Sequence, residues 1–152
     1  MFWRVTVTVA ILLPLLPTAA ARGQDPATEK PLPEKAWDVL RGAAEIDAFH
    51  LDPTGPAVFA GEWKYQVMSI AKTPGARKGI IDALDEGVKK AGKNKDGKFE
   101  PRYGVRATSG DTTVELVIDF ELGEIRISSG QDKAVIRTSG SPQSFFAKLF
   151  EI

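Results

Sequence analysis

The chain has 152 residues, of which 20 are basic and 20 acidic, so its formal net charge at pH 7 is zero. That balance argues against a dedicated nucleic-acid binder and against a polybasic membrane binder. The sequence has no cysteine, which excludes disulfides, thiolate metal ligands and cysteine nucleophiles, and nothing in it predicts a cofactor.

Residues 1–21 have the pattern of an export signal. Arg4 supplies a positive charge, residues 5–16 form an apolar run, and residues 19–21 are alanines. A short apolar run with these flanks is typical of a secretory signal rather than a membrane span. We therefore expect cleavage after Ala21, export to the periplasm or the exterior, and no membrane span in the mature protein. An uncleaved anchor is the alternative.

Residues 22–33 are polar and rich in proline, which predicts a disordered linker after cleavage. The remaining residues 34–152 are enough for one folded domain, and they contain no internal repeat. This domain opens with apolar residues at helical spacing over residues 34–45. The spacing predicts a short amphipathic helix that packs Trp37 and Leu40 onto a sheet.

Extended structure is predicted next. Residues 46–51 read as a strand, and residues 52–56 form a loop because they contain two prolines and a glycine. Residues 57–71 are predicted to be extended, with Gly61 marking a bulge or a bend. The alternation along this stretch predicts one face formed by Trp63, Tyr65 and Val67.

Two more helices are predicted from their starting residues. Thr73 and Pro74 form a typical helix start, since threonine caps free amides and proline fits the first turn. The apolar stripe of this helix is Ile80, Leu84, Gly87, Val88 and Ala91. Residues 92–97 form a flexible basic loop. Ser141 and Pro142 repeat the helix start near the end of the chain, and four apolar anchors follow: Phe145, Phe146, Leu149 and Phe150.

The region between these helices has the period-two alternation of half-buried strands. Three short loops divide it into a four-stranded antiparallel meander: Gly110-Asp111, Leu122-Gly123 and Gly130-Gln131. One face of this meander is apolar and the other is charged. We therefore predict an α+β fold, a single domain in which an antiparallel meander sheet carries two or three helices on one face.

Two-residue loops also fix a register. On the apolar face they pair Tyr103 with Ile118, Val105 with Leu116, Ile118 with Ile127, Phe120 with Ile125, and Ile125 with Ile136. On the charged face they place Arg106 opposite Glu115, and Asp119 between Arg102 and Arg126.

These five charged residues are the candidate ligand-binding site. The row of Arg102, Asp119 and Arg126, with Arg106 and Glu115 beside it, is suited to an anion or a carboxylate ligand. The alternative is a cross-strand charge ladder on a solvated sheet face, in which each pair contributes roughly 0.2–1 kcal/mol. No metal site is predicted.

Catalytic patterns are sparse. His50 is the single histidine, so zinc sites of the usual histidine and cysteine types cannot form in one chain. A serine triad would need His50, and no G-x-S-x-G turn accompanies it. A small hydrolase or lyase would have to use Asp119, Glu121 or His50 together with Tyr103. The neighbouring arginines keep such carboxylates ionised, which does not suit a general acid.

The segments KFEPRYG, at residues 98–104, and IDFEL, at residues 118–122, carry a motif. They resemble a family of small exported bacterial proteins of planctomycete type with the motif C-F-x-P-R-H-G followed by I-C-F-E-C. The matching residues are Phe99, Pro101, Arg102, Gly104, Phe120 and Glu121. Lys98, Asp119 and Leu122 replace the motif cysteines, and Tyr103 replaces its histidine. The resemblance extends weakly over residues 35–150. It implies a shared scaffold without a metal or thiol role and without a known activity.

These observations lead us to expect an exported, non-enzymatic interaction or ligand-binding domain whose partner is a protein or a small anionic ligand, not a nucleic acid. The hydrolase or lyase described above is the alternative. A third possibility is a subunit that docks through an edge strand or its aromatic helix, which requires an exposed apolar patch.

Overall fold

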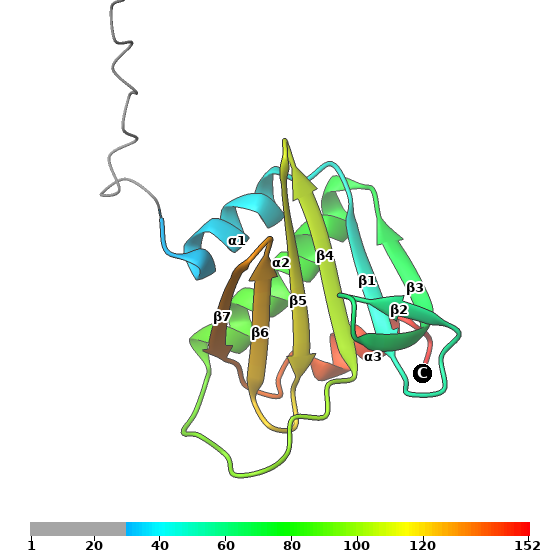
Figure 1. Cartoon of the computed structure of the whole chain (residues 1–152), viewed down its shortest axis with the longest axis vertical. Helices are drawn as coiled ribbons and strands as arrows, with labels where there is room; N and C mark the ends of the chain where they lie inside the picture. The colour runs from blue at the N-terminus through cyan, green and yellow to red at the C-terminus, as the bar shows by residue number, and fades with distance from the viewer. Residues whose placement is uncertain (1–29) are drawn as a thin grey trace, which may run out of the picture.

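The computed structural model describes residues 30–152. The predicted export signal and most of the predicted linker lie outside the described residues. The helices are α1 (Leu32–Gly42), α2 (Pro74–Lys89) and α3 (Gln143–Leu149) (Figure 1). The strands are β1 (Ile46–Leu51), β2 (Ala57–Phe59), β3 (Trp63–Ala71), β4 (Tyr103–Ser109), β5 (Thr112–Asp119), β6 (Glu124–Ser129) and β7 (Asp132–Arg137).

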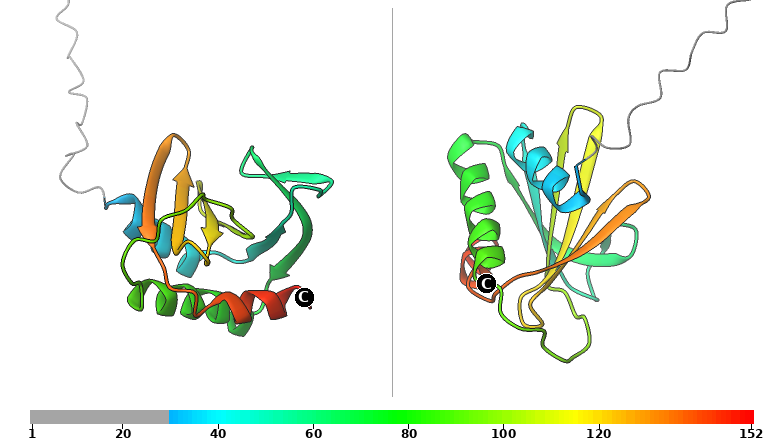
Figure 2. Two further views of the ribbon diagram at one scale, coloured as in Figure 1. Left: turned by 90° about the horizontal axis from the view of Figure 1, so that it is seen from below. Right: turned by 90° about the vertical axis from the view of Figure 1, so that its left-hand side faces the viewer.

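All seven strands join one antiparallel sheet in the order β2-β3-β1-β4-β5-β6-β7. Figure 2 shows the sheet curling, with the three helices on its convex side. This arrangement confirms the predicted α+β fold, and β4 to β7 are the predicted meander. None of the three helices in residues 30–152 has the length and hydropathy needed to cross a bilayer.

The main core lies between the helices and the sheet. Val105, Leu116 and Ile118 point into it and are fully buried, as the alternation predicts. Leu40 from α1, Leu84 from α2 and several aromatic residues near α3 close the other side of this core. Its aromatic part consists of Tyr103, Phe120, Phe146 and Phe150, whose neighbouring rings lie 5.4–6.2 Å apart.

The ends of the helices follow from their sequences. The Thr73 side chain accepts a hydrogen bond from the Ala76 amide at 3.2 Å, which confirms the predicted cap of α2. α3 differs from its prediction, because Pro142 occupies the N-cap position and no side chain caps this helix. α1 begins at Leu32, within the predicted linker, since Pro33 is compatible with a first helical turn.

The predicted register is confirmed between β4 and β5 and between β6 and β7. β4 pairs Tyr103 with Ile118 and Arg106 with Glu115, and β6 pairs Ile125 with Ile136. The register between β5 and β6 differs from the prediction.

β5 and β6 pair Ile118 with Ile125, so the connection has four residues, 120–123, and not two. Gly123 adopts a φ of 79° and donates its amide to the Asp119 carbonyl at 2.9 Å, which closes this wider turn. The shift moves each partner by two positions, so every side chain keeps its predicted face.

The β2–β3 hairpin corrects a second prediction. Of the two alternatives predicted at Gly61, a bulge or a bend, the structure has no bulge there: Gly61, with a φ of 70°, lies in the turn that reverses the chain between the two strands. The irregularity in β3 falls at Gln66, where β1 pairs His50 with Val67 and Leu51 with Tyr65. Because a bulge inserts one residue, Trp63 and Tyr65 pack on the side opposite the helices, whereas Val67 faces the helix side.

A second apolar cluster therefore lies on the sheet face that carries no helix. Its buried members are Phe49, Leu51, Phe59 and Val117, and Trp63, Tyr65 and Phe99 pack around them. Phe49 contacts the ring of Phe59, with centroids 4.4 Å apart, and the edge of Tyr65 at 4.9 Å. The curled β2–β3 hairpin thus covers part of the face that was predicted to be only charged.

Candidate functional site

A cleft opens where β1 ends, and we call it the β1-end cleft. It lies between the start of β3 and residues 98–102, and it encloses about 730 Å³. Its lining residues are His50, Leu51, Asp52, Pro53, Glu62, Trp63, Lys64, Lys98, Phe99, Glu100, Pro101 and Arg102.

The backbone after β1 explains why the sheet parts here. Leu51 donates its amide to the Arg102 carbonyl at 2.8 Å, and Asp52 donates to the Lys64 carbonyl at 2.9 Å. The Asp52 carboxylate then accepts hydrogen bonds from the amide and hydroxyl of Thr54, at 2.7 and 2.5 Å, which turns the chain away. These two hydrogen bonds also lower the pKa of Asp52. Because β1 ends here, no strand lies between the start of β3 and residues 98–102, and these two segments form the walls of the cleft.

Two aromatic rings from distant segments meet at the cleft. Trp63 at the start of β3 and Phe99 contact each other edge to face, with centroids 5.8 Å apart and an interplanar angle of 76°. The guanidinium of Arg126, from β6, lies over the Phe99 ring at 3.7 Å from its centroid. Arg126 therefore supports the aromatic wall without lining the cleft itself.

The carboxylate of Asp119 holds the second wall in place. One of its oxygens accepts a hydrogen bond from the Glu100 amide and the other accepts one from the Leu122 amide, both at 2.8 Å. Arg102 adds a backbone hydrogen bond to the Ile118 carbonyl at 3.2 Å. Only 4% of Asp119 is exposed. Its carboxylate thus acts as a staple between the end of β5 and residues 98–102.

Some charged side chains at the cleft have close partners within the protein and others do not. Asp52 is occupied by Thr54, and Lys98 lies 3.6 Å from the carboxylate of Glu100. Arg102 has one long ion pair, 3.8 Å to Glu121, between two side chains that are about two-thirds exposed.

Lys64 makes no side-chain ion pair or hydrogen bond within the described residues. Two weakly engaged cations, Arg102 and Lys64, therefore line the same opening as Glu62.

The structure does not assemble the predicted row of Arg102, Asp119 and Arg126. Since β6 is shifted, Arg126 lies opposite Val117 and forms an ion pair of 2.8 Å with Glu124. Of the predicted ligand-binding residues, Arg102 alone lines the β1-end cleft.

Arg106 and Glu115 do form the predicted cross-strand pair, with a nitrogen-to-oxygen distance of 2.7 Å. The Arg106 guanidinium also covers the rings of Phe49 and Phe59 at 5.4 and 5.3 Å. This pair shields the second apolar cluster and lies outside the β1-end cleft.

In the alternative hydrolase or lyase, the two rings and the two carboxylates are separated: Tyr103 and His50 are neighbours, whereas Asp119 and Glu121 lie elsewhere. Tyr103 is 5% exposed and packs on the helix side, 6.1 Å from the His50 ring, and burial raises the pKa of its phenol. Asp119 lies on the opposite sheet face, bound to backbone amides, and Glu121 projects into solvent. Within residues 30–152, no three histidine or acidic side chains converge as metal ligands.

The contact between Trp63 and Phe99 is not predicted by the sequence pattern. The alternation places Trp63 only on a strand face, and the motif alone singles out Phe99. The alternation of apolar and polar residues predicts which side chains share a face of a strand. It does not predict which loop packs against that face, here residues 98–102. The motif was the one signal for residues 98–102, because it marked this loop as a unit together with residues 118–122.

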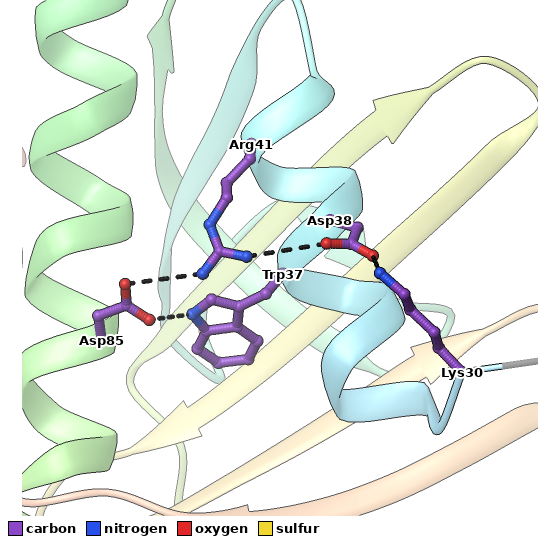
Figure 3. Close-up of polar contacts among 5 residues, drawn as sticks. All are labelled: Lys30, Trp37, Asp38, Arg41 and Asp85. Atoms are coloured by element: carbon purple, nitrogen blue, oxygen red, sulfur yellow. Dashed lines mark hydrogen bonds and ion pairs between the residues drawn. The ribbon is translucent and has the colours of Figure 1, made fainter.

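A second, shallower groove separates α1 from α2, and Figure 3 shows its polar contacts. The indole nitrogen of Trp37 donates a hydrogen bond to Asp85, and Arg41 lies 3.9 Å from the same carboxylate. Lys30 forms an ion pair of 2.7 Å with Asp38, and this hydrogen bond lowers the pKa of Asp38. The contacts of Trp37 and Arg41 with Asp85 fasten α1 to α2, and the Lys30–Asp38 pair neutralises charge beside them, so we assign this groove a structural role.

Comparison with known proteins adds no assignment: no protein-family model matches the chain, and no match is found among curated proteins or solved structures.

Proposed function

We propose that this protein is an exported, non-enzymatic ligand-binding domain. Its ligand is a small molecule or a peptide end that combines an aromatic or apolar body with an anionic group. The observation that carries this proposal is the β1-end cleft, where the aromatic pair Trp63 and Phe99 stands beside the weakly engaged cations Arg102 and Lys64.

The dimensions and chemistry of the cleft support a ligand of this class. A volume of about 730 Å³ falls within the range typical of small-molecule sites, which combine apolar walls with a few placed polar groups. An aromatic body would stack on Trp63 and Phe99, and a carboxylate would pair with the guanidinium of Arg102. The N-terminal pattern supports export, which would place this cleft outside the cytoplasm.

We also propose that the chain belongs to the exported family that its motif resembles. Supporting this, the two motif segments lie against each other: the Glu100 amide donates a hydrogen bond to the Asp119 carboxylate, and the Arg102 amide donates one to the Ile118 carbonyl. Gly97, directly before the first segment, lies close to the Leu122 side chain, since a Cβ there would be 3.3 Å from it. The positions that carry cysteines in the motif therefore fall at one corner of the sheet. The structure of a cysteine-bearing relative would contradict this membership if its two motif segments lie apart.

The binding proposal can be tested by NMR titration of the protein with phenylacetate and indole-3-acetate. The matched neutral probes are the corresponding amides, which keep the ring and lose the charge. We expect the acids to shift the amide signals of residues 62–64 and 98–102, and the amides to bind at least about tenfold more weakly, since hydrogen bonds to charged groups contribute about 1.5–3 kcal/mol.

The variant carrying both Arg102→Ala and Arg126→Ala should bind the two acids more weakly than the native chain, by a similar factor, while its fold stays intact. Lys133→Ala on the distant strand β7 is the control and should leave binding unchanged. Equal shifts with acids and amides, or unchanged binding by the double variant, would contradict the proposed ligand class.

A further inference from the structure

One edge of the sheet is open and apolar. β2 pairs with β3 only as far as Tyr65, so residues 67–71 have no neighbouring strand on their outer side within the described chain (Figure 1). Val67, Met68 and Ile70 are 40%, 43% and 43% exposed, although residues 67–71 contain no charged side chain. An edge of this kind is a template for another strand, because its backbone amides and carbonyls are unpaired.

The opposite edge of the sheet is protected in the usual way. β7 carries Asp132, Lys133 and Arg137, and Val135 is its one large exposed apolar residue. Charges on an edge strand oppose the docking of a second strand. The contrast between the two edges of one sheet singles out β3 as the side suited to pairing.

We propose that a second copy of this chain pairs with the open edge of β3, antiparallel and centred on Ser69. A twofold axis through Ser69 places Met68 opposite Ile70 of the other copy, twice, on the face without helices. It also places Val67 opposite Ala71, twice, on the helix side. Each exposed apolar residue of this edge thereby meets an apolar partner, and the two seven-stranded sheets join into one.

The flanking residues select this register. Residues directly opposite each other in an antiparallel pair point to the same face of the sheet. The twofold axis must therefore pass through a residue, since an axis between two residues would pair side chains that point to opposite faces. Centring on Met68 would place Val67 opposite Ser69 and Ile70 opposite Gln66, so two apolar residues of the open edge would meet polar ones. Centring on Ser69 places Gln66 opposite Lys72 instead. The bulge at Gln66 and the start of α2 at Pro74 end the paired stretch on either side.

The predicted dimer is weak. Two five-residue edges bury less surface than the roughly 1,200–2,000 Å² of a standard stable interface. We therefore expect a monomer–dimer equilibrium that depends on concentration, measurable by sedimentation velocity between about 1 μM and about 500 μM for an affinity in the micromolar range or weaker. The protein should be expressed from its complete coding sequence, and the oligomeric state does not depend on the ligand proposed above.

Two single substitutions test the register. Met68→Lys and Ile70→Glu should each abolish the dimer, because each places a charge opposite an apolar residue of the other copy. An equimolar mixture of the two variants should recover it as a heterodimer, since the introduced ammonium of one variant then faces the introduced carboxylate of the other. Val135→Lys, at the other edge of the sheet, is the matched control and should leave the dimer of the native chain unchanged.

A native chain that remains monomeric across the whole range would overturn the proposal. So would a dimer that survives Met68→Lys, or a mixture of the two variants that stays monomeric. Both substituted side chains are exposed, so circular dichroism should show native folding in each variant.

Discussion

The amide of Glu100 donates a hydrogen bond of 2.8 Å to the carboxylate of Asp119, nineteen residues further along the chain. The other oxygen of that carboxylate holds the Leu122 amide, so one buried side chain fixes both a wall of the β1-end cleft and the turn after β5. The carboxylate that was predicted to bind a ligand is therefore buried, and both of its oxygens are engaged by backbone amides of the protein itself.

Removal of this staple is the first prediction. Asp119→Ala should lower the free energy of unfolding by about 1–3 kcal/mol, because it leaves two amides without their acceptor. Asp119→Asn should cost less, since one amide oxygen remains to accept a hydrogen bond. Urea unfolding measures both changes, and hydrogen exchange at the Glu100 amide should accelerate in Asp119→Ala, which has no side-chain acceptor left. Unchanged exchange at Glu100 would show that the carboxylate does not hold this segment.

The second prediction concerns Gly104, whose Cα lies beneath the ring of Phe59. A Cβ at this position would lie 2.5 Å from Phe59 Cε1, closer than packed carbon atoms approach. Gly104→Ala should therefore destabilise the protein by about 1–3 kcal/mol, as overpacking does. Chemical unfolding measures the change.

Two further variants isolate the cause. Phe59→Ala removes the obstructing ring, so Gly104→Ala should cost much less in that background. Gly75→Ala in the first turn of α2 meets open space and should stabilise the protein by about 0.4–1 kcal/mol. An additive double variant would exclude the clash as the cause.

The third prediction is a pH dependence that arises from Asp47. Burial raises its pKa above the ordinary value of 3.8, Glu45 raises it further, and one of its carboxylate oxygens has no hydrogen-bond partner. A raised pKa means that the folded state binds the proton more tightly than the unfolded state, so the contribution of Asp47 to stability falls as the pH rises through that raised pKa.

Asp47→Asn should therefore be more stable than the native chain at pH 7, by less than about 1 kcal/mol, and this advantage should vanish below pH 3.8. Thermal unfolding across pH 3–7 provides the comparison. An advantage that grows toward low pH would reverse the sign and contradict the explanation.

The fourth prediction concerns the contact between α1 and α2 in Figure 3. Trp37 is 8% exposed and its indole nitrogen donates to Asp85, so Asp85→Ala leaves that donor without its acceptor. We expect a loss of about 1–2 kcal/mol in the free energy of unfolding. The control is Asp82→Ala on the same helix, which removes only an exposed ion pair with Lys78 and should cost less than about 0.5 kcal/mol. Equal losses in the two variants would exclude the Trp37 hydrogen bond as the cause.

Much of the fold could be predicted because local patterns determine it. The alternation around Val105 and Leu116 fixed which residues face the helices, and Thr73 marked the start of α2. The β5–β6 register could not be predicted, because a two-residue and a four-residue turn preserve the same alternation. The choice between them depends on the hydrogen bond from the Leu122 amide to Asp119, which is a property of the folded turn.

The candidate site was less predictable for a related reason. The bulge at Gln66 reverses the facing of Trp63 and Tyr65, and no glycine or proline marks its position. Phe99 reaches Trp63 only because residues 98–102 replace β1 beside β3, which is a matter of tertiary contact. Arg102 does line a cleft, but the register that was predicted to place Arg126 opposite Asp119 was wrong, because Asp119 pairs with Glu124.

The sheet separates two apolar clusters, one beneath the helices and one beneath the β2–β3 hairpin. The walls of the β1-end cleft belong to the smaller cluster and to a loop held by hydrogen bonds. Trp63, Lys64 or Phe99 can therefore be exchanged, and the chemistry of the cleft walls changed, without altering the packing between the helices and the sheet. A scaffold divided in this manner is well suited to the grafting of new recognition surfaces.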